Sequence, residues 1–299
     1  MRAEVTLDVL ERQIGGRTGT FDVPCPLCGP DRHHPLNRRR KVMRIWRHDA
    51  GFASYHCVRC GASGYARLDC DGNRPVDPIM LMRARAEARR REREYAIIQH
   101  RKSLWLWRHR RPITGSIAET YLRELRHYHC QFPATLGFLP SRGEHSPAMI
   151  AAVGVPEEME PAVVAINDAA VRGVHITKLK ADGSGKADMK PNKVVISRCI
   201  GWPIVLAPVN DLLGLAICEG IEDALSTYEA TGLGAWAAGG ASRLAALAEA
   251  IPEYVESLSI LVDDDNAGRR HSAELARRAA AHGIEVRQID IGGIWRNAA

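Results

Sequence analysis

The sequence of 299 residues lacks any run of the roughly 18–20 consecutive apolar residues that a membrane-spanning helix needs. No apolar stretch follows Met1, so we expect no secretory signal, and the sequence favours a cytoplasmic protein without a membrane partner. It also lacks a phosphate-binding loop of the Gly-x-x-x-x-Gly-Lys-Ser/Thr type, which excludes a fused motor domain of that class. Hydrophobic residues make up 45% of the chain, enough for a packed core.

Eight cysteines without a secretory signal argue against a disulfide framework, and four of them have the spacing of a metal site. Cys25-Pro-Leu-Cys28-Gly is answered by Cys57-Val-Arg-Cys60-Gly. Two such pairs can place four thiolates around a tetrahedral Zn²⁺, and the residues between them can form β-hairpins. A site closed by four sulfurs has no open position, so we expect structural zinc. Two unrelated pairs of reduced cysteines are the less favoured interpretation.

Positive charge is concentrated in the first half of the chain. Residues 1–130 contain 26 Lys or Arg against 14 Asp or Glu, whereas the remainder contains 15 against 21. A basic half favours a polyanionic partner such as nucleic acid, although a generally basic surface is the alternative. Between the two cysteine pairs, a basic stretch surrounds one large aromatic side chain: Arg38, Arg39, Arg40, Lys41, Arg44 and Trp46.

A strand in this stretch would place Arg44 and Trp46 on one face and Arg47 on the other, so that neither face is cleanly buried. Such a ribbon could bind single-stranded DNA, with arginines on phosphates and Trp46 stacked on a base. Trp46 could equally complete the core of a small zinc ribbon. Farther along, residues 69–78 are typical of a linker, and residues 79–110, rich in Arg and without Gly or Pro, predict one long basic helix or two.

Two apolar runs near the C-terminus end on carboxylates. Residues 215–218 run into Glu219-Gly220, and residues 259–262 run into Asp263-Asp-Asp265. Each run is typical of a buried strand followed by a helix, and the carboxyl ends of parallel strands meet at one edge of a sheet. Three carboxylates gathered there would need a cation, and oxygen ligands favour Mg²⁺ or Mn²⁺. The alternative is that these carboxylates only cap the helices that follow.

Residues 161–200 predict a β-rich subdomain with a turn at residues 181–185. Lysines on its second strand and after the turn could bind the phosphates of a nucleoside triphosphate, or they could belong to a solvated hairpin. These lysines are Lys178, Lys180, Lys186, Lys190 and Lys193. Upstream, Ser116 and Glu119 match a capping box, and Ala148–Val153 is a helical candidate.

The C-terminal third alternates strands and helices, which favours a mostly parallel sheet with right-handed crossovers. The expected strands are 204–207, 215–218, 233–237, 258–262 and 284–289, and the expected helices are 221–231, 242–250 and 268–282.

These residues resemble a known family. Glu219-Gly220 after a strand, with Asp263-x-Asp265 and Ala-Gly-Arg after a later strand, is similar to the Toprim domain of bacterial-type primases, topoisomerases, recombination mediators and some nucleases. The resemblance to primase-like proteins of phages, prophages and plasmids covers residues 116–292. It includes Glu219-Gly-Ile-Glu-Asp-Ala-Leu-Ser226 and residues 118–122 and 145–149. It implies that Glu219 acts in catalysis and that Asp263 and Asp265 hold metal.

The resemblance also implies an organisation and a reaction. We expect a template-binding zinc ribbon at residues 1–70, a basic helical linker at 71–130, a β-rich basic subdomain at 131–210 and an α/β Toprim domain with a mostly parallel sheet at 211–292. The expected activity is Mg²⁺-dependent synthesis of short primers from nucleoside triphosphates on single-stranded DNA. Because no motor domain is present, any unwinding would come from a separate helicase.

Two alternatives stay open. A Toprim nuclease would cleave DNA with Mg²⁺ in the absence of nucleotides. A non-catalytic accessory factor of replication or recombination would bind DNA without metal-dependent turnover.

Overall fold

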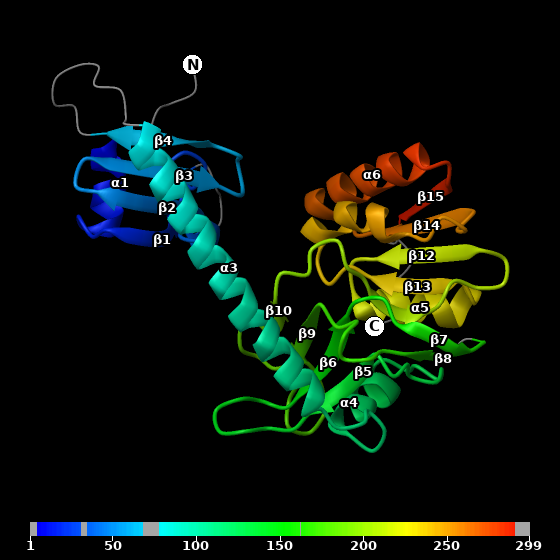
Figure 1. Ribbon diagram of the computed structural model, residues 1–299. Coiled ribbons are helices and arrows are strands. Elements are labelled where there is room, and N and C mark those ends of the chain that lie inside the picture. Colours follow the sequence, from blue (N-terminus) through cyan, green and yellow to red (C-terminus); the bar gives the residue numbers. More distant parts are fainter. Residues whose placement is uncertain (1–4, 31–34, 68–77, 162, 291–299) are drawn as a thin grey trace. The chain divides into compact units, whose positions relative to one another are not determined.

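The computed structural model describes residues 5–30, 35–67, 78–161 and 163–290. Its chain divides into two compact units, Met1–Arg91 and Glu92–Ala299, and each unit is described by itself (Figure 1). The linker expected at residues 69–78 lies, apart from Pro78, outside the described residues. None of the described helices is both long enough and apolar enough to cross a membrane.

The first unit is built on a four-stranded antiparallel sheet in the order β1-β2-β3-β4. Helix α1 (Leu7–Ile14) buries three apolar side chains in the same core as Met43 and Ile45 of β2. A short helix α2 (Pro35–Arg38) precedes β2. The strands are β1 (Gly19–Pro24), β2 (Lys41–Asp49), β3 (Phe52–Cys57) and β4 (Ser63–Arg67).

Strand β2 corrects one expectation, because one of its faces is fully buried. Met43, Ile45 and Arg47 are all less than 4% exposed. The buried arginine pairs with Glu11 of α1, so an ion pair compensates for a charge on the core face. Trp46 lies on the opposite, partly exposed face and is not part of the core.

The basic segment forms one helix, α3 (Pro78–Arg108), which begins in the first unit and ends in the second. Its last turn is anchored by Trp107, which is fully buried among Ile150, Val174 and other apolar residues. The guanidinium of Arg110 lies 3.5 Å from the centre of the Trp107 ring and covers it.

The second unit opens with helix α4 (Ile117–Thr120), which continues into a π-helical turn η1 (Tyr121–Leu125). The Ser116 hydroxyl caps α4 by accepting a hydrogen bond from the Glu119 amide, as the capping box predicts. An antiparallel sheet follows in the order β10-β9-β6-β5. Its strands are β5 (Leu136–Leu139), β6 (Ala148–Val153), β9 (Gly173–Lys178) and β10 (Lys193–Ile196); β7 (Glu157–Glu160) and β8 (Val163–Ala165) form a separate pair.

The helix expected at Ala148–Val153 was wrong, because this segment is strand β6. All six of its side chains are buried, and it pairs with β5 on one side and β9 on the other. A central strand covered on both faces is apolar throughout, so six residues carry no alternation that would distinguish it from a helix.

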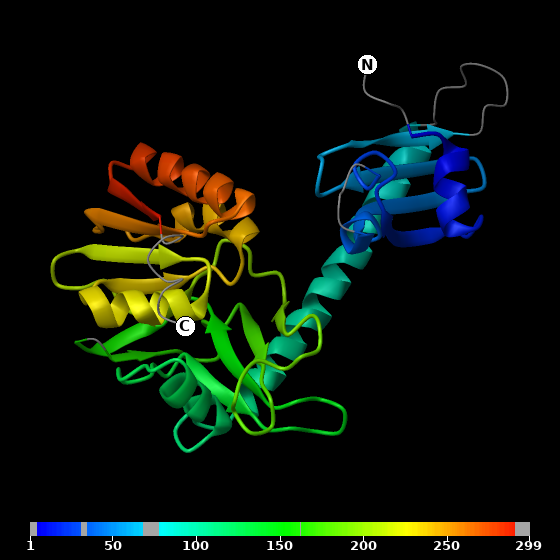
Figure 2. The same cartoon turned by 180° about the vertical axis from the view of Figure 1, so that it is seen from behind.

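The C-terminal sheet has the order β11-β13-β12-β14-β15, and all its pairs except β11 with β13 are parallel. Helix α5 (Ile221–Thr231) covers one face, while α6 (Asn266–Ala281) and the 3₁₀ helix η2 (Ala241–Ala250) cover the other (Figures 1 and 2). The strands are β11 (Ile204–Ala207), β12 (Gly214–Cys218), β13 (Gly234–Ala237), β14 (Ser257–Val262) and β15 (Glu285–Asp290). The core beneath α5 is continuous with that of the β-rich sheet, which packs the two parts of this unit together.

Candidate functional site

The four cysteines of the first unit form a cluster. Cys25 Sγ lies 3.9 Å from Cys60 Sγ, and Cys28 Sγ lies 3.9 Å from Cys57 Sγ. All four sulfurs lie within 4.8 Å of one another. A tetrahedral zinc site with Zn–S bonds of about 2.3 Å requires sulfurs about 3.8 Å apart, so the donors fit Zn²⁺ in both chemistry and spacing.

The predicted DNA-binding residues of this unit lie on β2 and just before it. Arg39, Arg40 and Lys41 are exposed, and Arg44 forms a two-pronged ion pair with Asp22 of β1 at 2.8 and 2.9 Å. Arg38 is also exposed, at the end of α2. Because Trp46 points away from the core, on the same face as Arg44, the structure favours the surface interpretation of this side chain over the core one.

Strand ends place the three predicted carboxylates at one edge of the C-terminal sheet. Glu219 directly follows β12, and Asp263 directly follows the neighbouring β14. Burial and then the nearby Asp263 raise the pKa of Glu219, and burial likewise raises the pKa of Asp263. These two residues therefore share one site, as the topology predicts.

The third carboxylate, Asp265, caps α6. One oxygen, Oδ1, accepts hydrogen bonds from the Ala267 amide at 2.8 Å and the Gly268 amide at 2.6 Å. Among the described residues, the four cysteines are the only group of three or more His, Cys, Asp or Glu side chains placed to hold a metal ion, so the three carboxylates do not form such a group. Asp265 still contributes to raising the pKa of Glu219 by charge repulsion. Asp265 therefore caps α6 and acts electrostatically on Glu219, whereas metal binding by Asp265 stays a prediction.

Two glycines allow these turns to be tight. A side chain at Gly268 would meet the Asp263 carbonyl oxygen at 2.7 Å, and one at Gly220 would meet the Asp223 carboxylate at 2.4 Å. Asp223 stands in the first turn of α5, where burial and then Glu222 raise its pKa. The glycines thus bring the acidic side chains close to the backbone of the strand ends.

Two of the predicted lysines reach this part of the molecule. Lys186 Nζ lies 2.6 Å from Glu222 Oε1, and Lys193 Nζ of β10 lies 3.5 Å from Glu222 Oε2. The others have different neighbours: Lys180 pairs with the exposed Asp188 at 3.6 Å, and Lys178 lies 3.4 Å from the Met189 sulfur. Lys190 is exposed and precedes Pro191. The five lysines therefore do not form a single cluster.

Sequence reasoning missed His175 of β9, which is 3% exposed beside this network. Burial, and then Lys193, lower the pKa of His175 to about 4, so its ring is neutral at pH 7. Its Nδ1 has no hydrogen-bond partner among the described residues. The sequence signal was a titratable side chain that alternates with Gly173, Thr177 and Leu179, opposite the face of Val174 and Ile176.

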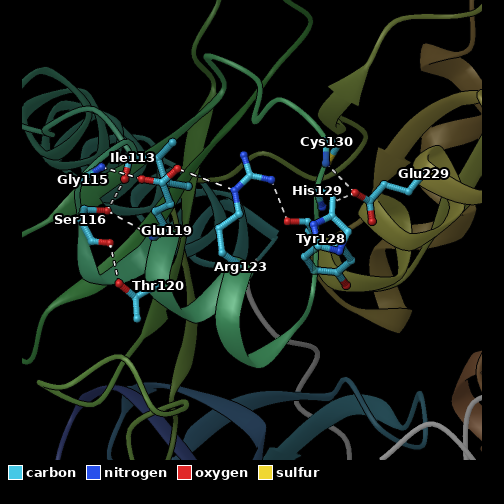
Figure 3. A network of polar contacts seen from close by, with 10 residues as sticks. All are labelled: Ile113, Gly115, Ser116, Glu119, Thr120, Arg123, Tyr128, His129, Cys130 and Glu229. Atoms are coloured by element: carbon cyan, nitrogen blue, oxygen red, sulfur yellow. Dashed lines mark hydrogen bonds and ion pairs between the residues drawn. The ribbon is translucent and has the colours of Figure 1, made fainter.

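The segment of residues 113–130 is hydrogen-bonded to both ends of α5. At the start of α5, the Tyr128 hydroxyl donates to the Glu222 carbonyl at 2.7 Å, and the Tyr121 hydroxyl donates to Glu222 Oε1 at 2.9 Å. Near its end, Glu229 accepts hydrogen bonds from the backbone amides of His129 and Cys130 (Figure 3). The same figure shows Arg123 between Glu119 and the Tyr128 carbonyl.

Comparisons with known proteins agree with this architecture. Residues 214–295 match the model of the Toprim domain, and residues 99–206 match that of a domain of unknown function (DUF7146). No curated protein sequence matches the chain.

Two solved primase structures are similar to the chain. The zinc-binding and RNA polymerase domains of the Aquifex aeolicus primase share 14% identity over 98% of this chain and 78% of that one, with a TM-score of 0.41. The primase fragment of the bacteriophage T7 primase-helicase shares 13% identity over 90% and 88%, with a TM-score of 0.37. The predicted resemblance and fold class are confirmed, since a mixed α/β chain carries a C-terminal Toprim domain and an N-terminal four-cysteine cluster.

Proposed function

We propose that this protein is a primase-like enzyme that joins nucleotides into short primers on a single-stranded DNA template. One observation carries the proposal. Two lysines of the β-rich subdomain contact the first turn of α5, the helix that starts directly after Glu219 at the acidic edge of the Toprim sheet. A metal-bound triphosphate requires carboxylates that hold the metal and cationic side chains nearby, because the metal and the cations together neutralise the phosphate charge.

The acidic residues fit a hard divalent cation in their chemistry. Burial raises the pKa of both Glu219 and Asp263, and neighbouring carboxylates raise it further: Asp263 acts on Glu219, while Asp223 and Asp265 act on Asp263. A cation would relieve that repulsion, and Glu219, Asp263 and Asp265 would be its ligands. Mg²⁺ or Mn²⁺ bound there would neutralise phosphate charge and assist the attacking hydroxyl. Lys186 and Lys193 would bind the phosphates, with Lys178, Lys180 and Lys190 along the path to the site.

The first unit would hold the template. Its four cysteines would bind structural zinc, which would join the end of β3 to the loop after β1. Arg38, Arg39, Arg40, Lys41 and Arg44 would contact DNA phosphates, and Trp46 would stack on a base. Any duplex would be opened by a separate helicase.

A primer-synthesis assay tests this proposal. Labelled nucleotides, Mg²⁺ or Mn²⁺ and single-stranded DNA of mixed sequence are incubated with the wild type and with Asp263→Asn and Glu219→Gln. Asp264→Asn is the matched control, because Asp264 is an exposed neighbour of Asp263 that forms an ion pair with Arg269. We expect short products from the wild type and the control, none from the two variants, and unchanged zinc content in all four proteins.

The same samples distinguish the alternatives. Metal-dependent cleavage of DNA without nucleotides, lost in Asp263→Asn, would replace the primase proposal with a nuclease. DNA binding without synthesis or cleavage would replace it with an accessory factor. Full activity of Glu219→Gln would remove Glu219 from the site.

A further inference from the structure

Glu222 is a largely buried acidic side chain at the boundary between the β-rich sheet and the Toprim sheet. Only 12% of its side chain is exposed, although it belongs to the first turn of α5, one turn before the buried Leu225. An acid on the packed side of a helix requires compensation for its lost hydration.

Its two carboxylate oxygens are both engaged. Oε1 lies 2.6 Å from Lys186 Nζ and accepts a hydrogen bond from the Tyr121 hydroxyl at 2.9 Å. Oε2 lies 3.5 Å from Lys193 Nζ. The three partners come from η1, from the loop after β9 and from β10, so one carboxylate gathers groups from three segments of the chain.

This geometry keeps Glu222 ionised. Burial alone would raise the pKa of Glu222, but Lys193 and Lys186 outweigh it and bring the pKa to about 2. The dependence is mutual for Lys186, whose pKa is lowered by burial and, to a smaller extent, by Lys193 and Arg126, while Glu222 opposes that shift. Without Glu222, the partly buried Lys186 would lose the group that keeps it charged and in place.

We propose that Glu222 is a positioning residue that holds Lys186 and Lys193 as charged ammonium groups beside the acidic edge, ready to bind the phosphates of a nucleotide. The nucleotide ligand in this inference rests on the proposed function, whereas the contact of Glu222 with the two lysines does not. Because both oxygens of Glu222 are engaged by lysines, its role differs from that of Glu219 and Asp263, which lie at the strand ends.

Two measurements on the full chain test the inference. The first is amine labelling at pH 8 with a limiting acylating reagent, followed by mass spectrometry of the peptides that contain Lys186 and Lys193. Glu222→Gln keeps the shape and removes the charge. Because only the neutral amine reacts, labelling of Lys186 should rise about tenfold for each pKa unit that is lost.

The second measurement is the dissociation constant of ATP, with EDTA present so that only side-chain contacts count. We expect about tenfold weaker binding by Glu222→Gln, the loss that corresponds to one charge-assisted hydrogen bond. Tyr121→Phe removes one donor to the same carboxylate and should shift both readouts in the same direction by less. Asp188→Asn is the matched control, since it neutralises the exposed partner of Lys180 and should leave both readouts for Lys186 unchanged.

The outcomes separate the inference from the proposed function. Unchanged labelling of Lys186 in folded Glu222→Gln would overturn the inference, whether or not ATP binds. Raised labelling with unchanged ATP affinity would also overturn it, because the lysines would then be held for packing alone. If the wild type binds ATP neither with EDTA nor with Mg²⁺ in its place, the proposed function fails, while the labelling ratio still decides whether Glu222 holds the lysines.

Discussion

Asp265 offers a test of whether a carboxylate at a strand end caps a helix, binds metal or does both. Oδ1 accepts from the amides of Ala267 and Gly268, which makes Asp265 the N-cap of α6. Asp265→Ser keeps an oxygen at this position but removes the charge, whereas Asp265→Ala removes both. We expect Asp265→Ala to lose about 1 kcal/mol of unfolding free energy and Asp265→Ser much less.

Thermal unfolding provides the assay. For a unit of about 200 residues, 1 kcal/mol corresponds to about 2–4 °C in Tm, which differential scanning fluorimetry resolves. Mg²⁺ that binds only the folded chain increases its unfolding free energy, by about 2.7 kcal/mol at a concentration 100 times its Kd, and therefore raises Tm. The wild type should respond to Mg²⁺, and Asp265→Ser should respond less despite its near-normal Tm without metal. A Ser variant that equals the wild type both in its Mg²⁺ response and in primer synthesis would refute metal binding by Asp265 and leave it as a cap.

Three further predictions follow from the same contacts. Removing zinc with a strong chelator, or the Cys28→Ser substitution, should lower the zinc content and the unfolding temperature of the first unit. Unfolding of this unit can be monitored by the fluorescence of Trp46, its single tryptophan. An unchanged unfolding temperature would contradict a structural metal. Burial, and then Lys193, lower the pKa of His175 to about 4, so between pH 6.5 and 4 the unfolded chain takes up a proton that the folded chain does not. The free energy of unfolding should therefore fall as the pH is lowered through that window. In urea titrations, His175→Gln should lose up to about 3 kcal/mol less unfolding free energy than the wild type over the same window. Arg47→Met should stabilise the first unit by about 1 kcal/mol or more in urea, because the buried guanidinium leaves Nε and Nη1 unpaired among the described residues; destabilisation would mean that the Glu11 ion pair outweighs desolvation.

The elements of the C-terminal sheet could be predicted because each has a clear period and a turn after it. Strand β11 and helix α5 have the predicted bounds. Strands β12, β13 and β14 each differ by one residue at one end, and β15 is shifted by one residue at both ends. The α6 cap at Asp265 begins the helix two residues before the predicted start. Segment 242–250 has the predicted position but is a 3₁₀ helix, a distinction that apolar periodicity does not resolve.

The zinc ligands and the pair of Glu219 and Asp263 were accessible from sequence for different reasons. Cysteine pairs of this spacing bring their sulfurs together through local turns, each within four residues. Glu219 and Asp263 meet because neighbouring parallel strands end at the same edge, a rule of topology that needs no knowledge of side-chain packing. The predicted domain boundaries and the DNA-binding role of the basic stretch stay predictions.

The contacts of Glu222 belong to a third kind, which depends on how two sheets pack. An acid in the first turn of a helix is expected anyway, since it is favourable beside the helix dipole, so the sequence did not indicate that Glu222 contacts lysines. Its partners lie 101 residues upstream at Tyr121 and 36 and 29 residues upstream at Lys186 and Lys193, and no repeat or spacing links them. Only the continuous core shared by the β-rich sheet and α5 brings them together. The proposed site, in which an acidic edge would hold metal and two lysines would bind phosphates, thus depends on the packing between sheets. Substitutions in that shared core should affect nucleotide affinity before they affect metal binding.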